Sequence, residues 1–329
     1  MSVLVIAEAG ANHNRNFDQA LSLIRVAHES GADAVKFQTY SSETLYSKNT
    51  PDFAGYKNIN NLIRDIELPR EWQEDLKCYC DEVGIEFMST PFDEAAAEQL
   101  VKLGVKRLKI AGFESTDPRF VRMVASFGLP LVVSAGIGSN IDSIKNIIDW
   151  ASKEQTNPDI TILHCNNAYP TPNTDINLNR IDNIRQTYPE VKVGLSDHTE
   201  GILAPSLAIA KGATCIEKHF TLSRHLPGPD HPFAVEPAML KKMIDQIRVA
   251  ETMCTDTQHA FTNSEQKFVK AMRSVVANQS IKKGDIFTTN NTTTKRPFLA
   301  GNIHSSEYYS VLGKQAGRDY NIDEFIKID

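Results

Sequence analysis

Eight short apolar runs in the first 220 residues constrain the fold of this chain most strongly. They occupy residues 3–8, 34–39, 85–90, 107–112, 130–136, 160–165, 192–197 and 214–219. Between them, apolar residues recur at the three- and four-residue spacing of amphipathic helices, as in residues 17–30 and 70–83. Eight strands that alternate with helices predict an α/β protein with a (β/α)8 barrel, the TIM-barrel fold, over residues 1–255.

The rest of the chain has a different character. Residues 256–272 are polar and lack a strong period, so they are interpreted as a linker. Residues 273–329 contain short β-branched runs that are broken by Gly, Asn and Pro, which predicts a small, loop-rich β domain. A domain of this size has a marginal core, so we expect it to pack on the barrel or on a partner's barrel.

Composition excludes several classes of function. The formal charge of −6 argues against nucleic acid or an anionic membrane as the main partner. No stretch has the eighteen or more apolar residues of a membrane span, and the N-terminal run, which Glu8 interrupts, does not resemble a signal peptide. The cysteines are odd in number and lie mostly in apolar patterns, so reduced thiols and a cytoplasmic location are predicted; they are Cys78, Cys80, Cys165, Cys215 and Cys254.

Two histidines, His198 and His219, stand at the ends of the last two apolar runs. A (β/α)8 barrel carries its active site at the carboxyl ends of its strands, so the two imidazoles should converge. Two neutral imidazoles with a carboxylate and open positions fit Mn, Fe, Co or Zn, and Glu8 at the end of the first run could supply the carboxylate. Alternatively, His198 caps a loop and His219 packs inside the barrel.

Two lysines, Lys36 and Lys109, lie inside otherwise apolar runs. A buried ammonium is costly without a partner, so each should meet a carboxylate or an anionic ligand. Hydroxyl groups stand at or near other strand ends, which predicts a phosphate- or carboxylate-binding site; they belong to Thr90, Ser134 and Ser196. The alternative is a structural ion pair with Glu8.

Polar groups also occur in the loops after the sixth and eighth runs. Asn167 and Tyr169 belong to a proline-stiffened loop, and their amide and phenol could orient a polyhydroxyl ligand or serve packing. Residues 226–233 form a rigid polar segment with Asp230 and His231, which suits a substrate loop.

Taken together, several segments resemble the sialic acid synthase family, the phosphoenolpyruvate-dependent nonulosonate synthases. The similar segments are IAEAGANHN (6–14), ADAVKFQT (32–39), STPF (89–92), LKIAGFE (108–114), VSAGI (133–137), LHCNNAYPTP (163–172), GLSDHT (194–199), EKHF (217–220) and PGPDH (227–231). The tail, with SIKKGD and TKRP, is similar to the antifreeze-like (SAF) domain of that family. The resemblance covers essentially the whole chain in order and spacing.

The resemblance implies that phosphoenolpyruvate condenses with the open-chain aldehyde of an N-acylated hexosamine, which gives a nine-carbon sugar and phosphate. It implies that His198 and His219 are ligands of a divalent metal, usually Mn²⁺, with Mg²⁺ and Co²⁺ as alternatives. It implies a phosphoenolpyruvate site made of Lys36, Thr90, Lys109, Ser134, Asn167 and Ser196. It places Glu8, Glu114 and Asp230 with the histidines as catalytic groups, and Gln38, Tyr169 and Arg296 at the sugar.

The resemblance also implies that Arg296 reaches into the site of the partner subunit, and hence a domain-swapped homodimer. The chain departs from the family at Gly112-Phe113-Glu114, where many relatives have Ser-Gly-Glu, so one hydroxyl of the phosphate site is missing. Phe113 is typical of pseudaminic acid synthases, whereas AYPTP and LPGPDH resemble sialic and legionaminic acid synthases.

The acceptor therefore stays open between N-acetylmannosamine and a 2,4-diacetamido-2,4,6-trideoxyhexose. A related aldol synthase with a sugar phosphate acceptor is the nearest alternative, although it would need an extra arginine cluster. A non-catalytic carbohydrate-binding or ice-binding protein is a further alternative, which only the tail suggests.

Overall fold

The computed structural model describes residues 2–52, 55, 57–255 and 260–327. Contacts divide the chain into two compact units, Met1–Thr255 and Asp256–Asp329.

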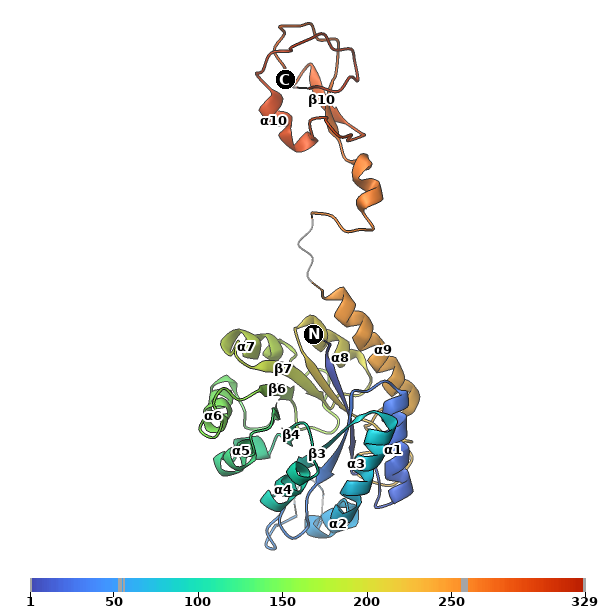
Figure 1. Ribbon diagram of the computed structural model, residues 1–329, viewed down its shortest axis with the longest axis vertical. Coiled ribbons are helices and arrows are strands. Elements are labelled where there is room, and N and C mark those ends of the chain that lie inside the picture. The colour runs from blue at the N-terminus through green and yellow to red at the C-terminus, as the bar shows by residue number, and fades with distance from the viewer. Residues whose placement is uncertain (1, 53–54, 56, 256–259, 328–329) are drawn as a thin grey trace. The chain divides into compact units, whose positions relative to one another are not determined.

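The first unit is built on a parallel eight-stranded sheet that curls into a barrel (Figure 1). The strand order is β3-β2-β1-β8-β7-β6-β5-β4, and β3 and β4, at the two ends of this order, lie next to each other. The predicted (β/α)8 barrel is therefore confirmed. The strands are β1 (Leu4–Gly10), β2 (Ala34–Thr39), β3 (Glu86–Pro91), β4 (Leu108–Ile110), β5 (Leu131–Ala135), β6 (Ile160–Cys165), β7 (Lys192–Asp197) and β8 (Cys215–His219).

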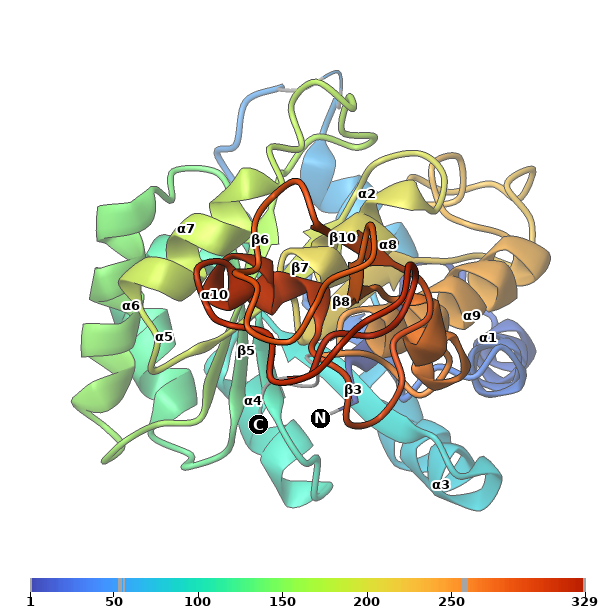
Figure 2. The same ribbon diagram turned by 90° about the horizontal axis from the view of Figure 1, so that it is seen from above.

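Helices surround the strands, as Figures 1 and 2 show from two directions. The predicted helix at 70–83 begins as a 3₁₀ turn, η1 (Arg70–Trp72), and continues as α3 (Gln73–Val83). The others are α1 (Phe17–Glu29), α2 (Ile59–Ile66), α4 (Glu94–Lys102), α5 (Pro118–Ala125), α6 (Ile141–Ser152), α7 (Asn179–Thr187), α8 (Leu203–Ala210) and α9 (Pro237–Met253), with a 3₁₀ turn η2 (Glu114–Thr116) after β4. We did not predict α2, which is short and has no side-chain cap.

Side-chain caps fix where several of these helices begin. Asn16 accepts a hydrogen bond from the amide of Gln19 at 3.0 Å, and Asp93 accepts one from Ala96 at 2.7 Å. Asn140 forms a capping box with Ser143 at the start of α6. Each cap satisfies amide groups that have no partner within the helix, so these loops end at defined residues.

The two-residue period of the strands sorts side chains between the inside and the outside of the barrel. Outward-facing residues pack against the helices in the main core. Inward-facing residues form a buried apolar layer of Ile6, Ala34, Met88, Val132, Leu163 and Cys215. The residue two positions further along each of these strands is polar, except for Cys165 on β6, and the next layer is Glu8, Lys36, Thr90, Ser134, Cys165 and Glu217. The barrel therefore changes from apolar to polar within one layer.

Lys218 lies one position out of phase with the inward-facing residues of its strand and has a structural partner. Its ammonium lies 2.7 Å from Oδ2 of Asp197 and donates to the carbonyl of Thr199, and both charged side chains are buried.

Replacing Lys218 by methionine should leave Asp197 uncompensated and lower the free energy of unfolding by about 3–5 kcal/mol. Urea denaturation would measure this loss. The double variant Lys218→Met with Asp197→Leu should recover part of it, and a loss below about 1 kcal/mol in the single variant would contradict the assignment.

The second unit has a small core of its own. Strands β9 (Ser274–Ala277) and β10 (Thr292–Lys295) pair antiparallel, with Ser274 opposite Lys295. The unit also contains the 3₁₀ turns η3 (Gln266–Ala271) and η4 (Ser305–Glu307) and the short helix α10 (Tyr308–Val311). Its core consists of Val275, Ala277, Ile281, Phe287, Val311, Ala316, Tyr320 and Ile326. Residues 256–259 of the predicted linker lie outside the described residues, and η3 occupies part of the remainder.

Candidate active site

A cavity of about 620 Å³ opens at the carboxyl ends of the barrel strands. Every site residue that we predicted in the barrel lines it: Glu8, Lys36, Gln38, Thr90, Lys109, Glu114, Ser134, Asn167, Tyr169, Ser196, His198, His219 and Asp230. Arg296 belongs to the second unit, where it follows β10 and is exposed. The barrel thus brings together groups that are up to 222 positions apart in the sequence, from Glu8 to Asp230.

Lys36 is the centre of the buried charges on the β1 side of the cavity. Its ammonium lies 2.7 Å from Oε2 of Glu8, 3.7 Å from Oε2 of Glu217 and 2.9 Å from the hydroxyl of Thr90. Gln38 donates to the other oxygen of Glu8 at 2.8 Å. Burial acts to lower the pKa of Lys36, but the carboxylates of Glu217 and Glu8 outweigh it and raise the pKa. Lys36 is therefore charged.

Glu8 itself is fully buried. Burial raises the pKa of Glu8 to about 7, and the ammonium of Lys36 opposes this rise. Its carboxyl group is thus poised to exchange a proton near neutral pH, as catalytic carboxyl groups often are.

Glu217 is a site residue that we missed, although it lies in the quoted EKHF segment. Its carboxylate accepts a hydrogen bond from Ser196 at 3.1 Å and lies between the ammonium groups of Lys36 and Lys109. Burial acts to raise the pKa of Glu217, but Lys109, Lys36 and His198 together lower it. The signal was available in the sequence, because Glu217 shares the strand parity of His219, two positions before it.

The positive charge of Lys109 is compensated less than that of Lys36. Its ammonium donates to the hydroxyl of Ser134 at 2.7 Å and to the carbonyl of Ile110 at 2.9 Å, whereas Oε1 of Glu217 is 4.0 Å away. Burial lowers the pKa of Lys109, since the nearby carboxylate compensates it only in part. An anionic ligand in contact with Lys109 would therefore be strongly favoured.

His198 and His219 lie side by side, with ring centroids 5.3 Å apart. Nδ1 of His198 is 2.7 Å from the carbonyl oxygen of Asn166, so Nδ1 carries the proton and Nε2 has a free electron pair. Burial lowers the pKa of His198, and burial together with His198 and Lys36 lowers that of His219 well below its ordinary value. Both imidazoles are therefore neutral, which is the form that binds metal.

The two histidines fit a divalent cation as a partial ligand set. Nδ1 of His219 is buried without a hydrogen-bond partner among the described residues, and it lies 3.8 Å from Oδ2 of Asp230. The carbonyl that orients His198 is the kind of supporting contact that metal-binding histidines make. No group of three or more His, Cys, Asp and Glu side chains in the described ranges is arranged to hold a metal. A cation held by these two imidazoles would therefore have coordination positions open for water or for an oxygen atom of the substrate.

The loop after β6 covers the histidines. The ring of Tyr169 lies 4.3 Å from that of His198, centroid to centroid. Asn167 accepts from the amide of Ile137 at 2.8 Å and donates to the hydroxyl of Tyr169 at 3.3 Å. A Cβ atom at Gly112 would lie 2.9 Å from Oδ1 of Asn167. The side-chain amide of Asn167 thus occupies the space that a side chain at position 112 would need.

Two acidic groups are held near the mouth. Asp230 accepts from the amide of Ala11 at 3.2 Å, and burial raises the pKa of Asp230. Burial likewise raises the pKa of Glu114, one oxygen of which has no hydrogen-bond partner among the described residues. Both carboxyl groups can therefore take part in proton transfer or bind a polar ligand.

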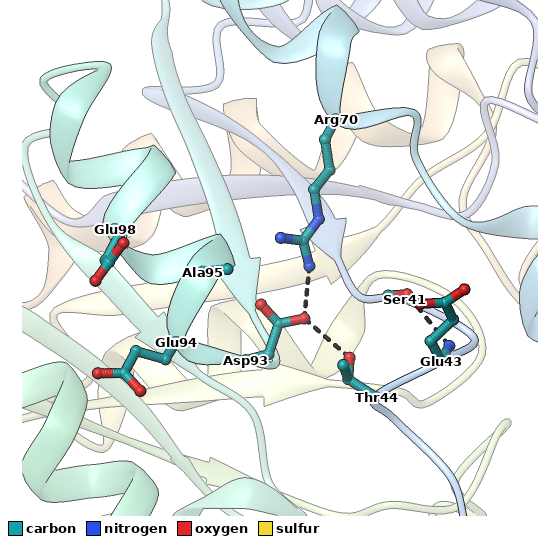
Figure 3. A pocket seen from close by; sticks show the side chains of 8 residues that line it. All are labelled: Ser41, Glu43, Thr44, Arg70, Asp93, Glu94, Ala95 and Glu98. Atoms are coloured by element: carbon teal, nitrogen blue, oxygen red, sulfur yellow. Dashed lines mark hydrogen bonds and ion pairs between the residues drawn. The ribbon is translucent and has the colours of Figure 1, made fainter. Parts of the chain in front are cut away.

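Figure 3 shows a separate surface depression between the start of α4 and the loop after β2. Arg70 points to Asp93 and forms an ion pair of 2.5 Å, and Asp93 also accepts from Thr44 at 2.9 Å. None of the predicted site residues lines this depression. Since Arg70, the cation that lines this depression, is paired with Asp93, we assign this ion pair a structural role.

The barrel, with its buried charges at the strand ends, defines a (β/α)8-barrel enzyme. The chain matches the model of the NeuB family over residues 23–259. It is 36% identical over 333 residues to the N,N′-diacetyllegionaminic acid synthase of Campylobacter jejuni, with 98% of each chain covered. It is 35% identical to the pseudaminic acid synthase of another strain of that species, with 99% of this chain and 95% of the relative covered.

A solved structure of a sialic acid synthetase is also similar to this chain. The crystal structure of the N-acetylneuraminic acid (sialic acid) synthetase of Leptospira borgpetersenii in complex with citrate is 32% identical, with a TM-score of 0.76. That match covers 82% of this chain and 91% of the other. The chain belongs to the NeuB family, which confirms the family resemblance seen in the sequence. In the described parts of the chain, no helix is both long and apolar enough to cross a membrane.

Proposed function

We propose that this protein condenses phosphoenolpyruvate with an N-acylated hexosamine to form a nine-carbon sialic-acid-type sugar and phosphate. The observation that carries the proposal is that cationic and neutral side chains line the cavity at different depths. Two buried ammonium groups with hydroxyl partners lie in one layer, and two neutral imidazoles lie toward the mouth. This arrangement suits a small, strongly anionic substrate below and a neutral polar substrate above.

In the proposed reaction, Lys36, Lys109 and the hydroxyls of Thr90, Ser134 and Ser196 bind phosphoenolpyruvate. Its C3 attacks the aldehyde carbon of the open-chain sugar, and the positive charge that develops at C2 is stabilised by the carboxylates of Glu8 and Glu217. Water adds at C2, and phosphate leaves by cleavage of its C–O bond. Because both substrates are held in one enclosed cavity, positioning supplies much of the rate.

A divalent cation, which we propose is Mn²⁺ with Mg²⁺ or Co²⁺ as alternatives, would be held by His198 and His219. When bound, it supplies a Lewis acid for the aldehyde oxygen. In this scheme Glu114 and Asp230 would move protons at the sugar oxygens, and Gln38 and Tyr169 would orient the sugar.

The cavity argues against an acceptor that carries a phosphate. Among the described residues that line it, the cationic side chains are Lys36 and Lys109, and no arginine is present. Both lysines are committed to one small anion in this scheme, so a second phosphate would lack a partner. A non-catalytic carbohydrate-binding protein would not need buried charges in this layer.

The direct test is release of inorganic phosphate from phosphoenolpyruvate in the presence of Mn²⁺, with N-acetylmannosamine and 2,4-diacetamido-2,4,6-trideoxyhexoses as acceptors. Release that depends on both metal and acceptor, and that EDTA abolishes, is the expected result. Release only with sugar phosphates would favour the related aldol synthases instead. No release with any acceptor, from folded protein, would contradict the proposed reaction.

We further propose that residues 273–329 form an antifreeze-like domain and that the protein works as a domain-swapped homodimer, with Arg296 at the acceptor's N-acyl group in the partner's cavity. The exposed guanidinium and the small core of this unit are consistent with such packing.

Replacing Arg296 by alanine should raise the acceptor KM about tenfold or more and leave the phosphoenolpyruvate KM unchanged. Lys314→Ala, at another exposed position, is the control. An unchanged acceptor KM, or a monomer in sedimentation, would contradict the swap.

A further inference from the structure

One wall of the cavity is apolar and is supplied by α2 and the loop before it. Ile59, Leu62, Ile63 and Ile66 line the cavity at the helical spacing of a single face of α2. Ile59 and Ile63 are buried, whereas Leu62 and Ile66 are only half-buried. The face that lines the cavity therefore keeps apolar surface available to a ligand.

This wall has its own small core, separate from the main core of the barrel. Tyr40, Ile59 and Ile63 form its centre, and Leu45 and Phe92 pack against it. The hydroxyl of Tyr40 donates to the carbonyl of Ile66 at 3.3 Å, so its proton already has a partner within the protein. The wall thus presents hydrocarbon to a cavity whose other side carries the charged groups.

Phe113 adds an aromatic ring to the same cavity. It precedes Glu114 in the loop after β4 and lines the cavity, and 54% of its surface is exposed. A large exposed aromatic side chain that lines the same cavity as this apolar wall offers a surface for the apolar face or the methyl groups of a sugar.

We propose that α2 and Phe113 form an apolar acceptor subsite that selects a sugar without a hydroxyl at C6. The inference rests on the proposed function, since the ligand is the acceptor of that reaction. A C6 hydroxyl against Leu62 and Ile66 would lose its hydrogen bonds to water and gain none from these two hydrocarbon side chains, whereas a methyl group would gain contact. The subsite therefore favours a 2,4-diacetamido-2,4,6-trideoxyhexose over N-acetylmannosamine.

The sharpest test uses two acceptors that differ by one atom, N-acetylmannosamine and 2-acetamido-2,6-dideoxymannose. Wild-type protein should turn over the 6-deoxy sugar with a kcat/KM about tenfold or more above that of the hydroxylated sugar. In Leu62→Asn, which places an amide on the wall, this ratio should fall toward one with the phosphoenolpyruvate KM unchanged. Phe113→Ser should lower kcat/KM for the 6-deoxy sugar. Asn61→Ala, on the exposed side of α2, is the matched control and should keep the wild-type ratio.

Equal kcat/KM for the two sugars, or an unchanged ratio in Leu62→Asn, would overturn the subsite. Binding of the two sugars, measured by calorimetry with Mn²⁺ and without phosphoenolpyruvate, separates this outcome from failure of the proposed reaction. A binding preference for the 6-deoxy sugar that Leu62→Asn removes would uphold the subsite even without turnover. If neither binding nor turnover distinguishes the sugars, the subsite is wrong whatever the reaction is.

Discussion

Replacing Lys109 by methionine should lower kcat/KM for phosphoenolpyruvate about a thousandfold. Methionine keeps much of the volume but removes a charged donor from a dry site, where one such donor contributes about a hundredfold to a thousandfold. The free energy of unfolding should change by less than about 2 kcal/mol, because Glu217 retains Lys36 at 3.7 Å. Steady-state phosphate release and urea denaturation would measure the two effects.

Two other lysines provide the comparison. Lys192 forms an exposed ion pair with Asp159, so Lys192→Met should change neither activity nor stability appreciably. Lys218→Met should lower stability much more than Lys109→Met. If kcat/KM of Lys109→Met for phosphoenolpyruvate stayed within twofold of wild type, Lys109 would serve only to balance Glu217.

Removal of either imidazole should abolish metal-dependent catalysis. His219→Ala and His198→Ala should each weaken Mn²⁺ binding at least about a hundredfold and reduce phosphate release about a thousandfold or more, because each removes one of the two ligands that we propose. Calorimetric titration with Mn²⁺ gives a readout that does not depend on turnover.

The matched control for the histidines is His225→Ala, since His225 is exposed in the loop after β8. It should bind Mn²⁺ and release phosphate as wild type does. Tight Mn²⁺ binding in both His198→Ala and His219→Ala would show that the cation binds elsewhere, and the two histidines would then have another role.

The sequence predicted the barrel because eight apolar runs alternate with amphipathic helices, and it predicted the place of the cavity because such barrels carry their sites at the carboxyl ends of the strands. Glu8, Lys36, Thr90 and Ser134 each follow an apolar inward residue by two positions, so their convergence follows from parity alone. The same parity would have identified Glu217. It would also have excluded Lys218, which is one position out of phase and lies in a structural ion pair.

Other features depend on contacts that no local pattern encodes. The short helix α2 has no side-chain cap, and its apolar face lines the cavity only because the barrel fold brings α2 to the carboxyl ends of the strands. The position of Asn167 beside Gly112 is set by the amide of Ile137, thirty residues away. Likewise, the degree to which Lys36 and Lys109 are neutralised depends on distances to Glu217, which strand register determines.

The buried apolar layer beneath the charged groups closes the inner end of the cavity, so the cavity has one entrance, at the carboxyl ends of the strands. Ile6, Met88 and Leu163 are fully buried within this layer, so molecules cannot pass along the barrel axis. Under the proposed reaction, the anionic substrate must arrive before the sugar that covers it, and phosphate can leave only after the nine-carbon product has departed. The packing of the barrel floor would thereby impose the order of a turnover.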